Sequence, residues 1–202
     1  ERLQKTLMSA MGVSVLFVGV SGALSQMLRA GGRALTVQGT MMMILSLAIG
    51  AVLGELLDLE DRMERFGAWL KVKTKSESDG GFIGAFVTAS LTVCIGAMAI
   101  VGSIQDGILG DHATLFAKAV LDLVIIMVMT ASMGKGCIFS AIPVGILQGS
   151  VTLLARLLQP VFTDAALSNL SLVGSVLVFC VGLNLVWGKK IRVANLLPSL
   201  LI

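Results

Sequence analysis

The sequence predicts an all-α polytopic membrane protein, with about six transmembrane helices in a single domain that covers residues 1–202. Apolar residues make up 56% of the chain and charged residues only 13%, whereas soluble domains carry about 25% charged residues. The mean hydropathy is +0.95, and the chain has 23 glycines and no tyrosine. This composition is typical of a packed helix bundle in lipid and not of a soluble enzyme.

Six apolar runs approach the roughly 20 residues that a helix needs to cross a bilayer. The expected spans are residues 7–26, 35–57, 81–104, 113–134, 137–158 and 170–187. A further run, 194–202, is too short to span. Pro143 lies in the fifth run, where its missing N–H permits a kink.

The positive charges predict the orientation of the chain in the membrane. Eleven of them fall on the side that holds the N-terminus: Arg2, Lys5, Arg62, Arg65, Lys71, Lys73, Lys75, Lys135, Lys189, Lys190 and Arg192. Only Arg29, Arg33 and Arg156 fall on the other side. The positive-inside rule makes the N-terminal side cytoplasmic, and the net charge of +3 is no sign of nucleic-acid binding. No cleavable signal peptide or initiator methionine is present, so we expect an upstream start.

Residues 58–79 form the longest polar insert, and residues 58–75 within it predict an amphipathic helix. An apolar face is formed by Leu59, Met63, Phe66 and Leu70, with the i,i+4 pair of Asp61 and Arg65 on the opposite face. We expect this helix to lie on the inner leaflet, with its cations near anionic lipid. A regulatory partner-binding helix is the alternative. Residues 74–80 read as a solvated linker.

Two short patterns recur and suggest internal repeats. A G-x-x-x-G motif occurs at residues 50–54 and 145–149, and a bulky pair followed by an apolar residue and a glycine occurs at 16–19, 93–96 and 179–182. Their order predicts a two-helix unit present three times, with 113–134 inserted and the first unit truncated. Transporter folds often contain such repeats. Close helix packing alone also explains the glycines.

Polar residues between 103 and 122 are the default functional site, because an ionisable side chain in hydrocarbon is costly unless it faces a partner or a wet cavity. Asp122 lies about 13 Å into its helix and so near the middle of the bilayer. Lys118 lies about 8 Å in, which lets its stem reach the interface, and it shares a helix face with Asp122. The pair is either a self-neutralised structural contact or an ion-responsive carboxylate with its counter-charge.

The loop 105–112 is expected to face outward and to carry an acidic mouth formed by Asp106 and Asp111, which would concentrate cations. Asp111 alternatively caps the next helix. His112 is the only histidine, and the cysteines at 94, 137 and 180 are widely spaced, so we expect buried thiols, no metal site and no cofactor.

Gln148 lies in the middle of the fifth run and is expected to line a cavity with Asp122. The hydroxyl residues Thr88, Ser90 and Thr92 of the third run are expected to contribute to the same cavity. No nucleophile with a partner base is evident, so we expect no enzyme activity.

Four strings carry a resemblance to a known family: GAMAIVGSIQDGILGD, LFAKAVLD, IPVGILQGSVTLLA and GLNLVWGKKIRVANLLPSLL. Over nearly its whole length the chain resembles the bacterial family of unknown function typified by the inner-membrane proteins YqgA and YdfK. The resemblance implies about seven helices, one of them ahead of ERLQKTL, and placement in the inner membrane. It supplies no activity. Its motifs contain Asp106, Asp111, Lys118, Asp122 and Gln148.

The leading functional hypothesis is a transporter or channel for an ion or small polar solute, in contact with the lipid bilayer and with homo-oligomer formation left open. Asp122 would be the coupling or ion-sensing carboxylate, Lys118 its counter-charge and Gln148 a hydrogen-bonding partner. Asp106 and Asp111 would form the outer mouth. The rival hypothesis is a non-transporting scaffold or regulatory subunit that holds a cytoplasmic partner through residues 58–75.

Overall fold

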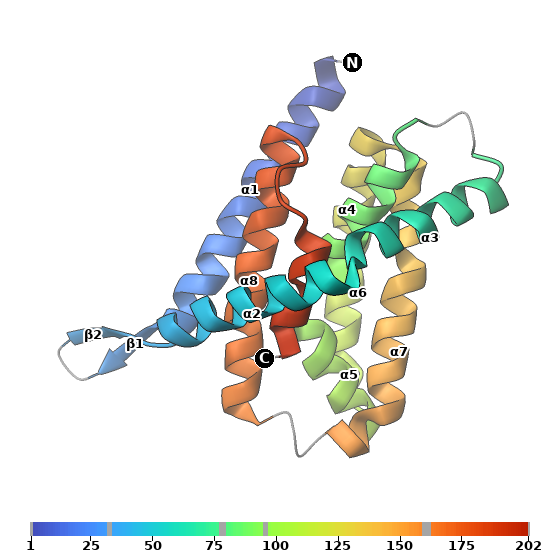
Figure 1. Cartoon of the computed structure of the whole chain (residues 1–202). Helices are drawn as coiled ribbons and strands as arrows, with labels where there is room; N and C mark the ends of the chain where they lie inside the picture. Colours follow the sequence, from blue (N-terminus) through green and yellow to red (C-terminus); the bar gives the residue numbers. More distant parts are fainter. Residues whose placement is uncertain (1, 32–33, 77–79, 95–96, 159–162, 202) are drawn as a thin grey trace.

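The computed structural model describes residues 2–31, 34–76, 80–94, 97–158 and 163–201. These residues are helical apart from one β-hairpin and short connections (Figure 1). The elements are α1 (Arg2–Met27), β1 (Leu28–Gly31), β2 (Ala34–Val37), α2 (Thr40–Leu57), α3 (Leu59–Lys73), α4 (Phe82–Cys94), α5 (Ala97–Leu109), α6 (Ala113–Met133), η1 (Lys135–Ser140), α7 (Ala141–Leu158), α8 (Asp164–Trp187) and η2 (Val193–Leu201). The predicted helical class is confirmed.

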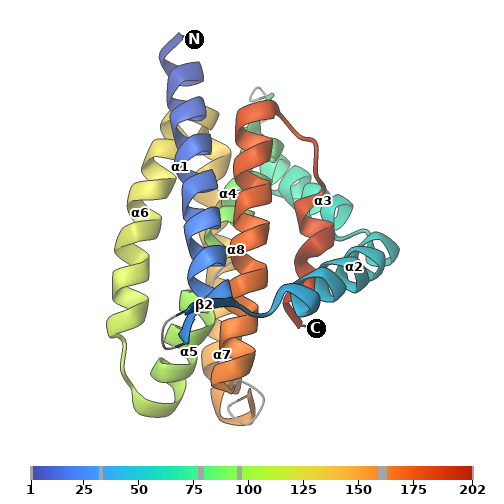
Figure 2. The same ribbon diagram turned by 90° about the vertical axis from the view of Figure 1, so that its left-hand side faces the viewer.

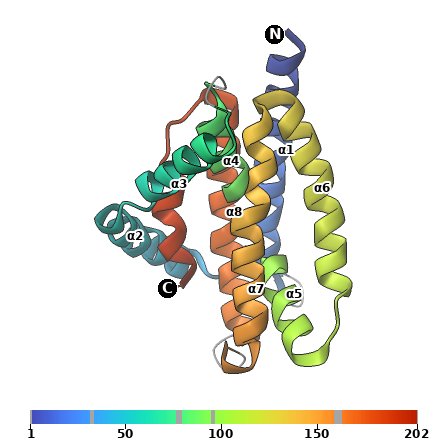
Figure 3. The same cartoon turned by 90° about the vertical axis from the view of Figure 1, so that its right-hand side faces the viewer.

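Helices α1, α6, α7 and α8 run side by side and define the axis of a bundle (Figures 1 and 3). The start of α1, the start of α4 and the ends of α6 and α8 lie at one end of it, which we call the N-terminal end. The turn between α5 and α6 and the start of α8 lie at the other. Helices α6, α7 and α8 thus alternate in direction, while the orientation of the chain in a membrane stays a prediction.

Four helical stretches within the described residues are long and apolar enough to cross a membrane, fewer than the six expected. They are residues 40–57, 113–133, 135–155 and 165–187, and two shorter apolar helices cover 12–27 and 82–94. Within the expected span at 81–104, α4 ends at Cys94 and α5 begins at Ala97. Residues 95 and 96, which complete the second copy of the glycine pattern, lie outside the described residues.

Two other expected spans begin later than the apolar runs suggest. The run at 35–57 opens with β2, which pairs antiparallel with β1, Leu28 opposite Val37. The run at 137–158 opens with the 3-10 helix η1, so Pro143 lies in the first turn of α7. A proline is tolerated in the first turn of a helix, and a kink at Pro143 stays a prediction.

The first and last long helices pack directly on each other through glycines. A Cβ atom placed on Gly19 would lie 2.6 Å from the backbone nitrogen of Phe179, and one on Gly182 would lie 2.8 Å from that of Leu16. Both glycines come from the predicted glycine pattern, and their lack of a side chain allows the two backbones to approach. The main apolar core lies beside this contact and includes Leu177 and Phe86.

Helix α2 lies at a steep angle to the long helices and packs against η2 (Figures 1 and 2). A Cβ on Gly54 would overlap the carbonyl of Asn195, and the hydroxyl of Ser46 donates to the carbonyl of Ser199 at 3.1 Å. The second G-x-x-x-G motif differs, because no described atom lies within 4 Å of a Cβ on Gly145 or Gly149. The two copies thus have different surroundings, and the internal repeat stays a prediction.

The amphipathic helix is confirmed as α3, but its buried face differs from the expected one. Gly67 and Leu70 are buried, and a Cβ on Gly67 would lie 2.9 Å from the ring of Phe86 in α4. Phe66 and Trp69 are instead exposed and stack with ring centroids 5.8 Å apart. Asp61 and Arg65 form the expected pair at 2.5 Å. Contact of α3 with lipid stays a prediction, and residues 77–79 of the linker lie outside the described residues.

Candidate functional site

Lys118 and Asp122 form an ion pair within the bundle, on adjacent turns of α6. The side chain of Lys118 is 8% exposed and that of Asp122 is 22% exposed. The ammonium of Lys118 donates to the Asp122 carboxylate and also to the carbonyl of Val93, 3.0 Å away. The expectation that Lys118 extends to the membrane surface is therefore wrong, because its stem turns inward to reach α4.

The partner carbonyl lies where the third apolar run is interrupted. Val93 is the penultimate residue of α4. Its carbonyl is therefore one of the last four of the helix, to which no backbone N–H of the same helix donates. These carbonyls carry the partial negative charge of the helix C-terminus. An interrupted helix in lipid needs such groups to be satisfied by neighbouring helices. Lys118 supplies that partner, and Asp122 balances its charge.

A cavity of about 420 Å³ opens beside this pair, between α6 and the segment from η1 into α7. Asp122 and Gln148 both line it, as the sequence predicts, together with Ser140. Among the described lining residues Asp122 is the only charged one, and most of the others are aliphatic. We call this space the inner cavity. It can hold a small solute against one carboxylate, one amide and one hydroxyl group.

The three hydroxyl residues expected in this cavity lie elsewhere. Thr88 lines a different cavity. Ser90 is fully buried, and Thr92 donates to the carbonyl of Thr88 at 2.8 Å, within α4. All three residues belong to α4, and residues two apart on a helix point in different directions, so they cannot all face one cavity.

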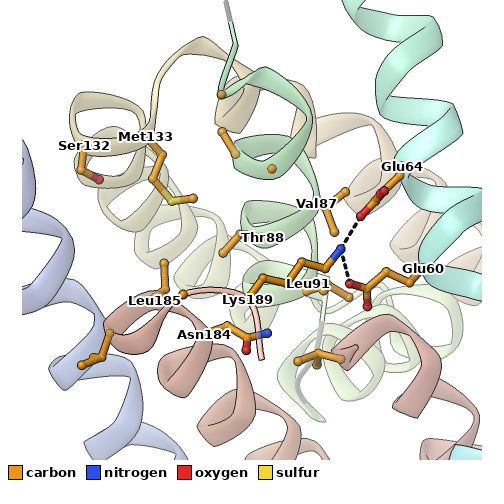
Figure 4. Close-up of a pocket in the computed structure, with 16 residues that line it drawn as sticks. Glu60, Glu64, Val87, Thr88, Leu91, Ser132, Met133, Asn184, Leu185 and Lys189 are labelled. Carbon is orange, nitrogen blue, oxygen red and sulfur yellow. Dashed lines mark hydrogen bonds and ion pairs between the residues drawn. The ribbon is translucent and has the colours of Figure 1, made fainter. Parts of the chain in front are cut away.

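A larger cavity of about 510 Å³ lies among α3, α4 and the end of α8, at the N-terminal end of the bundle (Figure 4). We call it the upper cavity. The ammonium of Lys189 lies between two carboxylates there, 2.7 Å from Glu60 and in contact with Glu64. Desolvation lowers the pKa of Lys189, but its hydrogen bonds to Glu60 and Glu64 outweigh this and raise that pKa above its ordinary value.

Buried amides and carboxylates join the parts that surround the upper cavity. Glu60 accepts a hydrogen bond from the backbone of Ala194, and its own backbone donates to the side chain of Asn195 at 2.7 Å. The side chain of Asn184 accepts from the backbones of Lys190 and Ile191. These contacts fix α3 and η2 to the end of α8. The sequence analysis did not predict these contacts. The one available signal was Gly67, because a glycine within an amphipathic helix is typical of close contact with another helix.

Asp106 and Asp111 lie near the start of α6, whereas the upper cavity lies near its end. Neither residue lines the inner cavity. Asp106 belongs to α5 rather than to a loop, and its carboxylate pairs with His112. Asp111 is exposed and accepts from the backbone of Ala113 at 3.0 Å, at the start of α6. This contact agrees with the capping role, while the acidic mouth stays a prediction.

The ligand types that hold metals are scattered. Among the described residues, no three of His, Cys, Asp and Glu gather as a metal ion would require. All three cysteines are described, and none forms a disulfide. The ion pairs that line cavities within the described residues are Lys118–Asp122 at the inner cavity and those of Lys189 at the upper one.

Comparison with known proteins gives a family but no activity. The family model "Protein of unknown function (DUF554)" matches residues 1–202. The chain is 31% identical over 202 residues to the uncharacterized membrane protein YdfK of Bacillus subtilis strain 168, covering all of this chain and 82% of the relative. It is 29% identical over 164 residues to the uncharacterized protein YqgA of Escherichia coli K12, covering 79% of this chain and 70% of the relative. No solved structure matches. The chain is a membrane protein that belongs to the DUF554 family, as its motifs predict.

Proposed function

We propose that the protein carries a small polar solute or an ion across the bacterial inner membrane through the inner cavity, without converting it chemically. The observation that carries this proposal is the ion pair of Lys118 and Asp122, whose ammonium also binds the Val93 carbonyl at the end of α4. Transporters bind their substrates and coupling ions near the bilayer midplane at discontinuous helices. A purely structural bundle has little use for a buried ion pair, since its desolvation cost is high.

The geometry assigns a role to each group. The carboxylate of Asp122 faces both Lys118 and the inner cavity, so a proton or cation that binds it competes with the ammonium of Lys118. Release of Lys118 from this pair would alter its bond to the Val93 carbonyl at the end of α4. Gln148 offers a donor and an acceptor on the facing wall. Occupation of the cavity is thereby coupled to the interrupted helix.

Neutralising the carboxylate tests this assignment. In the full-length protein reconstituted in vesicles, we expect Asp122→Asn to lower flux of the transported species, found from a panel of ions and metabolites, by about tenfold, the equivalent of roughly 1.4 kcal/mol. Asp61→Asn is the matched control, because Asp61 also belongs to an i,i+4 ion pair but lies on the exposed face of α3. Unchanged flux in a folded Asp122→Asn protein would refute the role of Asp122.

A scaffold that holds a cytoplasmic partner is the second candidate, and the exposed aromatic pair on α3 favours it. Trp69 is 57% exposed beside Phe66, and exposed aromatic residues are common at binding surfaces. On this hypothesis wild-type vesicles show no flux above empty ones. Trp69→Ala, and not Asp122→Asn, should then abolish co-purification of a partner from native membranes. Flux that depends on Asp122 would exclude this alternative as the main function.

A further inference from the structure

The inner and upper cavities lie along the same two helices, with a small apolar cluster between them. Both cavities are lined by residues of α4 and α6. The buried members of the cluster are Ala85, Ala89, Met129 and Cys137. Ala85 also lines the upper cavity, and Ile126, which packs on the cluster, also lines the inner one. One thin layer of side chains therefore separates the two spaces.

Met129 is the largest of these four side chains and is 1% exposed. The others are two alanines and a cysteine, so Met129 is the one long side chain among the buried members of the cluster. Methionine is unbranched and has three rotatable bonds, which lets it change shape without movement of the backbone. A neighbouring methionine, Met133, packs on the cluster and reaches the upper cavity (Figure 4).

Two polar groups near this layer have unmet hydrogen-bonding capacity. The hydroxyl groups of Ser90 and Thr130 are buried, and neither has a hydrogen-bond partner within the part of the chain that the structure describes. They adjoin Ala89 and Met129 in sequence, one on each of the two shared helices. Buried hydroxyls normally have partners in protein or water. Both helices that line the two cavities therefore hold a buried hydroxyl group one residue away from the apolar cluster.

We propose that Met129 is a plug between the two cavities, and that its displacement opens one continuous path from Asp122 to the Lys189 ion pairs. The inference rests on the proposed transport function and adds the residue that controls passage. Apolar constrictions of this kind close a pore by excluding water. A solute that passes the plug enters the upper cavity, where it meets the carboxylates of Glu60 and Glu64 held by Lys189 (Figure 4).

Thiol accessibility tests the plug without knowledge of the substrate. The three native cysteines are replaced by alanine, Gln148→Cys is introduced in the inner cavity, and sealed vesicles are treated with a membrane-impermeant maleimide on the side of the N-terminal end. With Met129 present, we expect slow labelling of residue 148 from that side. Met129→Ala should raise the labelling rate on the order of tenfold, because the sealed constriction becomes wet.

Met127→Ala is the matched control, since Met127 lies on the same helix but is 55% exposed on the outer surface. Equal labelling with and without Met129→Ala, or an equal rise with Met127→Ala, would overturn the plug. If Met129→Ala does not fold, Met129→Val removes less volume and carries the same expectations. Flux measured on the same vesicles separates the two proposals: flux with unchanged labelling refutes only the plug, whereas Met129-dependent labelling with no flux of any panel solute refutes transport.

Discussion

Gly54→Ala is expected to separate η2 from α2 and to destabilise the protein by about 3 kcal/mol, at the upper end of the usual cost of overpacking. The added methyl group would overlap the carbonyl of Asn195 and would lie 2.8 Å from its α-carbon. Backbone atoms cannot move aside as the end of a flexible side chain can. Asn195 also binds the start of α3, so the damage should spread to the upper cavity. Thermal unfolding in detergent measures the loss.

Gly149→Ala supplies the control for this change, because it alters the same motif where no described atom lies within 4 Å of the new methyl group. It should leave the unfolding temperature nearly unchanged, since alanine is also the better helix former. Equal stability of the two variants would mean that η2 does not pack on α2 as described.

Lys118→Met is expected to cost about 3–5 kcal/mol, the range found when one partner of a buried ion pair is removed. The substitution leaves the Asp122 carboxylate without its counter-charge and the Val93 carbonyl without its donor. The double variant Lys118→Met with Asp122→Leu should recover part of this loss, because no unpaired charge remains. Unfolding of the two single variants and the double variant gives the coupling energy directly.

The exposed ion pair of Asp61 and Arg65 on α3 provides the comparison. Arg65→Met removes the cation of another i,i+4 pair, but Arg65 is 80% exposed, so the cost should be below about 1 kcal/mol. If Lys118→Met lowered the free energy of unfolding no more than Arg65→Met does, the ion pair in α6 would not be desolvated. Its hydrogen bond to the end of α4 would then contribute no measurable stability.

Hydropathy predicted the long helices because length and apolar composition are properties of a local window. It did not predict the interruption between α4 and α5, because the residues from Cys94 to Ala97 are apolar or small and include no proline. The contact that satisfies the interrupted end comes from Lys118, 25 residues further on. A window that averages hydropathy cannot detect a hydrogen bond between two helices.

The candidate site was likewise predicted where local spacing decides and missed where contacts between helices decide. Spacing alone placed Lys118 and Asp122 on one face, while the depth of Asp122 in the membrane stays a prediction. Depth could not say which neighbour that face meets, so the direction of the Lys118 stem was predicted wrongly. The partners of Lys189 were missed altogether, because Glu60 lies in a distant amphipathic helix and the two residues meet only after α3 docks.

The contact between α2 and η2 also sets the order in which the protein is assembled. Ser46 and Ser199 are 153 residues apart, so α2 enters the membrane long before its partner is synthesised. At a translation rate of roughly 5–20 residues per second, that delay is on the order of ten seconds. Helix α1 must likewise wait for α8, its packing partner. The glycine faces of both early helices therefore remain without their partners during biogenesis, and the contact of α2 with η2 forms only after η2 has left the ribosome.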